Sequence, residues 1–283
     1  MQPIMKLLDA LRRIMGVRKS IHRPNSETCS DTARIYIQQR EDDITKHEQP
    51  NSETRPEAAR IKEICIQKGI HEVVHFTHVE NVDSIMKYGL LSIMDLNVRN
   101  IPYHYNDRER LECVPEGICL SISFPNYKMF YSYRRRAGEK SFVVFSLKPS
   151  LLWELPCLFC FSNASANEVR NRLTADRESL MTAEAFSAMF SEEAIRRHRI
   201  RRSVLNIPEN YTTDPQAEVI CLHPIDVSYI KAIYYNGKFD RLGQWQATEW
   251  GHLLQERPEF FNPRKDWEHW VWWRILLRLE AML

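Results

Sequence analysis

The pattern of hydrophobic and polar positions divides the chain into three stretches. After a first amphipathic segment, residues 1–68 are mostly polar and include two runs rich in Asn, Ser, Glu, Pro and Thr that are typical of linkers. Residues 69–240 alternate short apolar runs with helical patterns, which predicts alternating strands and helices. Residues 241–283 are rich in tryptophan, and the pattern at 266–283 predicts a helix that is apolar on most sides. Such a helix is usually packed against the rest of the protein, with a surface for a partner as the alternative.

The middle stretch predicts a compact α+β domain, because its short strands are joined by long irregular loops. Asn81 is a candidate N-cap for one of its helices, and Gly89 a candidate stop. With only 8 glycines and no Gly-rich fingerprint, a doubly wound dinucleotide-binding fold is not expected. The pattern predicts strands at 73–77, 117–123, 141–147, 219–222 and 230–235, and helices at 4–15, 56–68, 82–88 and 183–197.

Composition is that of an ordinary globular protein, with 283 residues, 43% hydrophobic and 27% charged. No apolar run reaches the roughly 18 residues of a membrane span, so we expect no membrane association. Charged residues interrupt the apolar pattern of the first segment, which is therefore not typical of a secretory signal. The 7 cysteines are scattered and odd in number, which favours a reducing cytoplasm over a disulfide framework.

A net charge of +2 indicates little about partners, but the arginines are clustered at 134–136 and 196–202. Clustered arginine is typical of a phosphate-binding surface, and a solvated helix face is the alternative. Cys157 and Cys160 form a Cys-x-x-Cys pair. No second pair has matching spacing for zinc and no thioredoxin-like helix start follows. We interpret them as buried cysteines and predict no metal site.

Four ordered blocks carry a family resemblance. They are residues 75–92, which begin His-Phe-Thr-His, residues 106–111 (Asn-Asp-Arg-Glu-Arg-Leu), residues 118–129 and residues 214–219 (Asp-Pro-Gln-Ala-Glu-Val). Over roughly 71–236 the chain resembles the DarT family, the DNA-modifying ADP-ribosyltransferase toxins of bacterial toxin–antitoxin and antiphage systems. The resemblance implies an ADP-ribosyltransferase-like core of short strands with flanking helices at 69–240. Residues 1–68 and 241–283 would be N- and C-terminal extensions.

The resemblance implies that NAD⁺ is the substrate and Glu218 the catalytic carboxylate. Cleavage of the bond to nicotinamide passes through an oxocarbenium-like state, which a carboxylate beside the ribose stabilises. An arginine is needed for the diphosphate or for charge near the ribose, because its planar fork suits both tasks. Arg110 matches the family's arginine best, with Arg108 as the alternative.

The first block implies further NAD⁺ contacts. The family places a dinucleotide-contacting histidine on the first strand, which indicates His75, and His78 competes with it. Thr77 and Asn81 belong to the same block and are predicted to contact the cofactor.

Recognition of an unpaired base needs stacking side chains and phosphate contacts. Tyr127 and Met129, followed by Arg134 and Arg135, supply that mixture. In ADP-ribosyltransferases the loop before the catalytic glutamate faces the acceptor, which implies the same role for the second arginine cluster. Its candidate nucleic-acid contacts are Arg197, Arg199 and Arg201.

The function implied is mono-ADP-ribosylation of a base of single-stranded DNA by a toxin or antiphage effector that has a neutralising antitoxin protein. The stretch 123–129 lacks the Pro-Arg pair of the thymidine-modifying branch and is similar to the guanine-modifying branch. Two alternatives stay open: a transferase of the same fold acting on RNA or protein, and a catalytically silent nucleic-acid-binding module.

Overall fold

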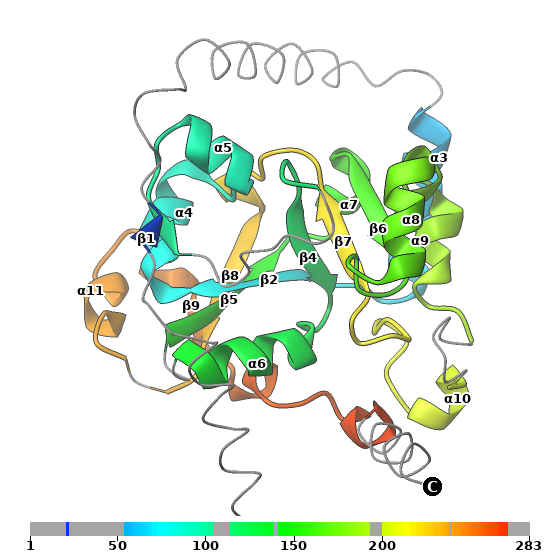
Figure 1. Ribbon diagram of the computed structural model, residues 1–283. Coiled ribbons are helices and arrows are strands. Elements are labelled where there is room, and N and C mark those ends of the chain that lie inside the picture. Colours follow the sequence, from blue (N-terminus) through cyan, green and yellow to red (C-terminus); the bar gives the residue numbers. More distant parts are fainter. Residues whose placement is uncertain are drawn as a thin grey trace, which may run out of the picture.

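The computed structural model describes residues 21–22, 54–104, 114–137, 141–192, 200–237 and 239–270. Within these ranges a seven-stranded sheet forms the centre of the molecule (Figure 1). Its strand order is β6-β7-β4-β2-β5-β8-β9, and neighbours are antiparallel except for the parallel pair β8 and β9. The sheet and its flanking helices are the α+β fold that the sequence predicts.

The described helices are short, the longest being α3 with 14 residues. The strands are β1 (Ile21–His22), β2 (Val73–His78), β3 (Tyr103–His104), β4 (Ile118–Ile122), β5 (Phe142–Leu147), β6 (Cys157–Cys160), β7 (Glu218–Cys221), β8 (Ile230–Tyr235) and β9 (Leu254–Glu256). The α-helices are α3 (Thr54–Gln67), α4 (Val82–Tyr88), α5 (Ile93–Val98), α6 (Tyr127–Ala137), α7 (Leu151–Glu154), α8 (Asn167–Ala175), α9 (Ala183–Ala188), α10 (Arg202–Leu205) and α11 (Leu242–Gln246). The 3₁₀ turns are η1 (Val79–Asn81), η3 (Glu178–Leu180), η4 (Val227–Tyr229), η5 (Gly251–Leu253) and η6 (Pro258–Phe261).

Both faces of the sheet are covered, because its strands carry apolar residues at alternate positions on each face. On one face Val73 of β2 and Phe145 of β5 pack with α3, α7 and α9. On the other face Val74 and Val144 pack with α6 and η6. Figure 1 shows α6 below the sheet, α4 and α5 to its left, and α3, α8 and α9 to its right.

The sheet opens between its two central strands. All six residues of β2 pair with β5, but only Val73 and Val74 pair with β4. The ladder between β2 and β4 therefore ends after two residues, and a cavity lies between the later part of β2 and β4. An opening in the middle of a sheet brings backbone and side chains of both strands to a ligand.

Most elements predicted for the middle stretch are present. The helix at 82–88 and the strand at 230–235 have the predicted bounds, and the strands of the other predicted runs differ by one or two residues. Gly89 ends α4 as expected. Its φ of 78° is left-handed, and a side chain there would meet the Ile225 carbonyl. The helix expected at 183–197 is shorter, since α9 ends at Ala188; residues 193–199, like the helix predicted at 4–15, lie outside the described residues.

The segments on both sides of the predicted transferase domain pack against its sheet. Ile61 and Cys65 of α3 belong to the main core, and β9 extends the sheet beyond β8. Trp270 is buried against Ile200 and Leu205 beside α10, which confirms that an aromatic residue of the C-terminal helix packs onto the rest of the protein. The three-part division at 68/69 and 240/241 stays a prediction.

Candidate active site

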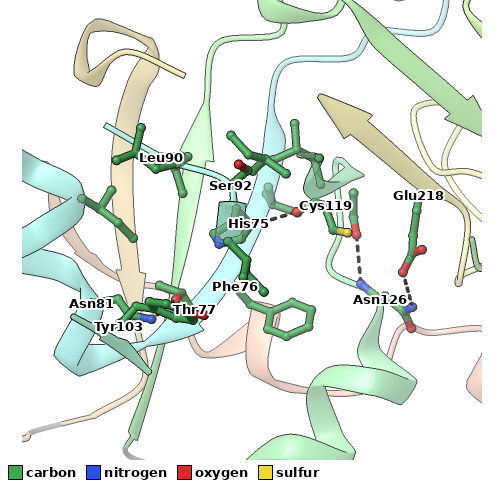
Figure 2. Close-up of a pocket in the computed structure, with 18 of the residues that line it drawn as sticks. His75, Phe76, Thr77, Asn81, Leu90, Ser92, Tyr103, Cys119, Asn126 and Glu218 are labelled. Carbon is green, nitrogen blue, oxygen red and sulfur yellow. Dashed lines mark hydrogen bonds between the residues drawn. The ribbon is translucent and has the colours of Figure 1, made fainter. Parts of the chain in front are cut away.

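The cavity between β2 and β4 has a volume of about 220 Å³. Figure 2 shows Glu218 and Asn126 at one end of it, Thr77 and Asn81 at the other, and His75 between them. Its other walls include the 89–93 turn and residues of α4, α5, α6, β3 and β4. Four residues predicted to act on NAD⁺ thus line one cavity, although 137 or more positions separate Glu218 from the others in the sequence.

Glu218 is the first residue of β7 and is only 6% exposed. Its Oε2 accepts a hydrogen bond of 2.9 Å from the Ala164 backbone N–H, and its Oε1 accepts one of 3.3 Å from the Asn163 side chain. The Asn126 side chain donates to Oε1 from 3.5 Å. Since β7 lies between β6 and β4, the carboxylate stands on a rigid strand with both oxygens held by amide donors.

Asn81 holds the far wall of the cavity together. Its side-chain amide donates to Thr77 Oγ1 (2.9 Å) and to the His104 carbonyl (2.8 Å), and its Oδ1 accepts from the His104 backbone N–H at 2.8 Å. Asn81 occupies the predicted N-cap position of α4, but its side chain makes no capping bond to that helix. The amide instead binds the backbone of His104 and so attaches β3 to η1, the turn after β2.

The side chains of His75 and His78, both on β2, lie in different environments. His75 Nδ1 lies 2.9 Å from the Cys119 carbonyl of β4, so this ring bridges the opening between the two strands and lines the cavity. His78 caps η1 by accepting from the Glu80 backbone N–H, and its ring stacks on His104 at 4.9 Å. His78 does not line the cavity. Of the two competing histidines, the geometry favours His75.

Two predicted nucleic-acid contacts are corrected by the structure, because both side chains are buried under α6. The Tyr127 ring packs in the core between α6 and η6, and burial raises the pKa of its hydroxyl. The Arg134 guanidinium donates to the Phe261 carbonyl and stacks on Phe130 and Phe261. Helix α6 must bury one face, and positions 127, 130 and 134 lie on that face.

The other predicted nucleic-acid residues on described segments remain accessible. Met129 is half-buried and lines the cavity, Arg135 is exposed with its guanidinium over Tyr131 at 5.8 Å, and Arg201 is exposed at the start of α10. Arg108 and Arg110, predicted to act on NAD⁺, and Arg197 and Arg199, predicted to bind nucleic acid, lie outside the described residues.

Three residues of the site were not predicted to belong to it. Asn126 both caps α6, by accepting from the Met129 backbone N–H at 3.3 Å, and donates to Glu218. An Asn directly before an apolar helical pattern is a capping signal that indicates its position. Asn163 and Ala164 bind Glu218 from 55 and 54 residues away, a contact that no local pattern indicates.

The Cys-x-x-Cys pair lies on β6, where both thiols are buried. A hydrogen bond with Cys221 and burial raise the pKa of the Cys157 thiol, and burial raises that of Cys160. Thiols with raised pKa values are weak nucleophiles and weak metal ligands. Over the ranges that the structure describes, no three His, Cys, Asp or Glu side chains lie close enough to hold a metal ion. No helix in those same ranges is long and apolar enough to cross a membrane.

An open sheet whose cavity ends at a strand-borne glutamate is the arrangement expected of an ADP-ribosyltransferase, the class of fold that the sequence predicts. The sequence profile of the family described as "ssDNA thymidine ADP-ribosyltransferase, DarT" matches residues 74–240. Because the match takes in more than half of the 283 residues, the chain belongs to the DarT family. Members of this family are NAD⁺-using ADP-ribosyltransferases.

Solved structures with a similar fold include Thermus sp. 2.9 DarT in complex with ADP-ribosylated ssDNA, at 12% identity and a TM-score of 0.48, covering 69% of this chain and 97% of that one. The same Thermus protein in complex with NAD⁺ gives 13% identity and a TM-score of 0.45, covering 68% and 98%. Thermosipho africanus DarTG in complex with ADP-ribose gives 16% identity and a TM-score of 0.46, covering 68% of this chain but only 51% of that chain. Comparison with curated proteins gives no match.

Proposed function

We propose that the protein transfers one ADP-ribosyl group from NAD⁺ to a base of single-stranded DNA. The observation that carries the proposal is the placement of Glu218 at the end of a cavity, with both carboxylate oxygens held by amide donors. A carboxylate kept in one orientation stabilises positive charge that develops on the neighbouring ribose without reorganising during the reaction. His75, Thr77 and Asn81 line the same cavity and would contact the dinucleotide.

The diphosphate of NAD⁺ requires a cationic partner. None of the cavity-lining residues that the structure describes is Lys or Arg. The stretch 105–113 joins His104, which lines the cavity, to Val114, three residues before Gly117, which also lines it. Arg108 is four residues from His104, within about 13 Å along an extended chain. Arg110 is likewise four residues from Val114, and it matches the family's arginine best. We therefore propose Arg110, with Arg108 as the alternative, for the diphosphate or the reacting ribose.

The acceptor strand would approach over α6 and over the second arginine cluster, residues 196–202. Met129 lines the cavity, and Arg135 and Arg201 are exposed cations on described segments. Together with Arg197 and Arg199 they supply the flat apolar surface and the phosphate contacts that single strands need. The reaction product distinguishes this proposal from its two alternatives. A transferase of the same fold would modify RNA or protein, and a silent binding module would form no product.

For the acceptor base we propose guanine. The support is the stretch 123–129, which lacks the Pro-Arg pair of the thymidine-modifying branch. The description of the matching family names thymidine instead. The same segment contributes Asn126 and Met129 to the site, so its sequence bears on which base fits there. The two bases differ in size and in hydrogen-bonding edge, so one oligonucleotide pair separates them.

The test is a mass measurement on matched single-stranded oligonucleotides after incubation with the full chain and NAD⁺. One oligonucleotide contains guanine and no thymine, a second contains thymine and no guanine, and a third repeats the first as RNA. An adduct of one ADP-ribosyl group on the first alone supports the full proposal. An adduct on the second alone replaces guanine with thymine, and modification of RNA alone contradicts the DNA substrate. If no oligonucleotide carries an adduct and NAD⁺ stays intact, the result contradicts the proposal and supports the catalytically silent nucleic-acid-binding module.

We further propose that the modification makes the protein a toxin, because adducts on DNA bases block copying, and that a neutralising antitoxin protein accompanies it. We place the protein in the cytoplasm, where NAD⁺ and single-stranded DNA are both present. Expression from a tightly controlled promoter tests the toxic role: the intact protein should arrest growth, while the Glu218→Gln variant should not. Equal arrest by both would contradict a toxicity based on ADP-ribosylation.

A further inference from the structure

The segment that precedes Glu218, residues 200–217, is held by arginines bound to its backbone carbonyls. We refer to it as the pre-Glu218 segment. Arg202 lies within it and donates to the carbonyls of Pro208 (2.7 Å) and Tyr211 (2.7 Å). It also reaches Thr213 Oγ1 at 3.2 Å. Burial lowers the pKa of this guanidinium, and Arg202 is thus a structural residue although it belongs to the predicted phosphate-binding cluster.

A second arginine reaches the same segment from the C-terminal part of the chain. Arg264 donates from Nη1 to the Thr212 carbonyl (2.7 Å) and from Nη2 to the Thr213 carbonyl (3.1 Å). Its Nε and Nη2 also pair with the two carboxylate oxygens of Asp266 at 2.7 and 2.5 Å. The Trp270 indole donates to Asp266 Oδ2 at 2.8 Å. We call Arg264, Asp266 and Trp270 the C-terminal clamp.

The C-terminal clamp is fully enclosed, since the side chains of Arg264 and Asp266 are 3% and 0% exposed. A buried ion pair is a poor way to add stability, because desolvation of both charges offsets most of their attraction. What it does well is set geometry: a guanidinium fork that binds a carboxylate and two carbonyls leaves little freedom to any of them. In Figure 1 the C-terminal segment runs below α6 toward α10, which brings the clamp to this position.

The fixed geometry continues from the clamp to the catalytic carboxylate. Directly after Thr213, the Asp214 side chain accepts from Ser162 Oγ (2.7 Å) and from the Gln216 backbone N–H (2.8 Å). The Ala217 backbone N–H donates to the Asp214 carbonyl at 3.0 Å, and Glu218 follows. Hydrogen bonds thus restrain every residue from Thr212 to Ala217 except Pro215, so a displacement at the clamp moves this segment. Glu218 itself keeps its separate bonds to Asn163 and Ala164.

We propose that the C-terminal clamp positions the pre-Glu218 segment so that the acceptor base, and not water, occupies the place next to the reacting ribose carbon. In both reactions the bond from this carbon to nicotinamide breaks. In transfer a nucleophilic atom of the base forms the new bond and a proton is released, whereas in hydrolysis water forms it and yields ADP-ribose and a proton. The clamp lies beyond residues 74–240 that match the family, and the proposal rests on the proposed function.

The test measures how released nicotinamide divides between ADP-ribosyl oligonucleotide and free ADP-ribose, using the full chain. Arg264→Lys keeps the charge but lacks the fork. We expect the fraction transferred to DNA to fall about tenfold and the KM for the oligonucleotide to rise. The KM for NAD⁺ and the rate of nicotinamide release should stay within about twofold, since the cavity wall is untouched. Lys265→Ala, an exposed neighbour in the same turn, is the matched control and should behave as the wild type.

A gentler variant covers the case in which Arg264→Lys does not fold. Trp270→Phe keeps an aromatic ring, though a smaller one, against Ile200 and Leu205 and removes the hydrogen bond to Asp266. It should lower the transferred fraction by a smaller factor, and its melting curve should show that the protein is still folded at the assay temperature. An unchanged fraction, or transfer and hydrolysis falling in parallel, would overturn the positioning role. If the wild type itself forms no adduct, the proposed function fails first and the clamp proposal fails with it.

Discussion

The wall of the cavity formed by residues 74–104 and the pre-Glu218 segment, which leads directly into Glu218, are held by different contacts. The wall is stabilised from within, by the hydrogen bonds of Asn81 to Thr77 and His104 and by the capping box of Ser92 and Asp95. The pre-Glu218 segment is held partly from within, by Arg202, but it also depends on Arg264, about 50 residues later, and on Ser162, 52 residues before its partner Asp214.

The comparison indicates how the two substrates are recognised. A wall that carries its own hydrogen bonds keeps its shape whatever surrounds it, which suits the dinucleotide that the whole family uses. A segment clamped by a distant part of the chain changes when that part changes, which suits the acceptor side of the proposed reaction. Four substitutions test this contrast.

Glu218→Gln should affect both regions at once, because they meet at this residue. The amide keeps the shape but loses the charge that stabilises the ribose cation, so transfer should fall by about 10² to 10³-fold. NAD⁺ affinity should change little, since Asn81 and His75 are untouched. Single-turnover kinetics and NAD⁺ titration measure the two quantities. Glu249→Gln, an exposed glutamate on another segment, is the control, and near-normal turnover of Glu218→Gln would contradict the catalytic role.

Trp270→Ala should lower the free energy of unfolding by about 3 kcal/mol, because a large buried aromatic leaves a cavity beside α10. Denaturant unfolding measures this value. The matched control is Trp267→Ala, whose side chain is 41% exposed and should cost well under half as much. Equal losses for the two variants would mean that burial at position 270 contributes no more than the exposed position, contrary to the structure.

Asn81→Ala should loosen the cavity wall and leave the pre-Glu218 segment intact. Both Thr77 and His104 lose their partner, and we expect the KM for NAD⁺ to rise about tenfold, as loss of one or two such hydrogen bonds predicts. The division between transfer and hydrolysis should not change, in contrast to Arg264→Lys. Steady-state kinetics measure both quantities, with Asn171→Ala, at an exposed asparagine of α8, as the reference. A shift in the division between transfer and hydrolysis would contradict the separation of the two regions.

Arg201→Ala should have the smallest effect, on DNA binding alone. Loss of one phosphate contact lowers the slope of log K against log salt by about 0.7 on single strands. Fluorescence titration of an oligonucleotide at several salt concentrations gives this slope. Arg241→Ala serves as the control, because Arg241 is paired with Glu80 and Asp83. A slope that stays the same in the Arg201 variant would assign this arginine to a solvated surface.

Much of the fold and part of the site follow from local patterns in the sequence. Short apolar runs predict the strands β2, β5 and β8, and helix α4 ends at Gly89 because only glycine fits its left-handed φ beside the Ile225 carbonyl. The ordered sequence motifs indicate Glu218 and the cavity-lining residues of β2 and η1. The residues of β2 and η1 are within a few positions of one another, so one local motif can indicate them together.

Tertiary structure alone decided which polar residues serve the site and which serve the core. Arg134 and Arg135 are adjacent in the same cluster, yet one is buried on Phe261 and the other is exposed, because a helix turns 100° per residue and only one face meets the core. Likewise Asn163 and Arg264 look like ordinary surface residues in the sequence. They reach their partners because the chain folds back over more than 50 positions, and no pattern of a few residues encodes such a distance.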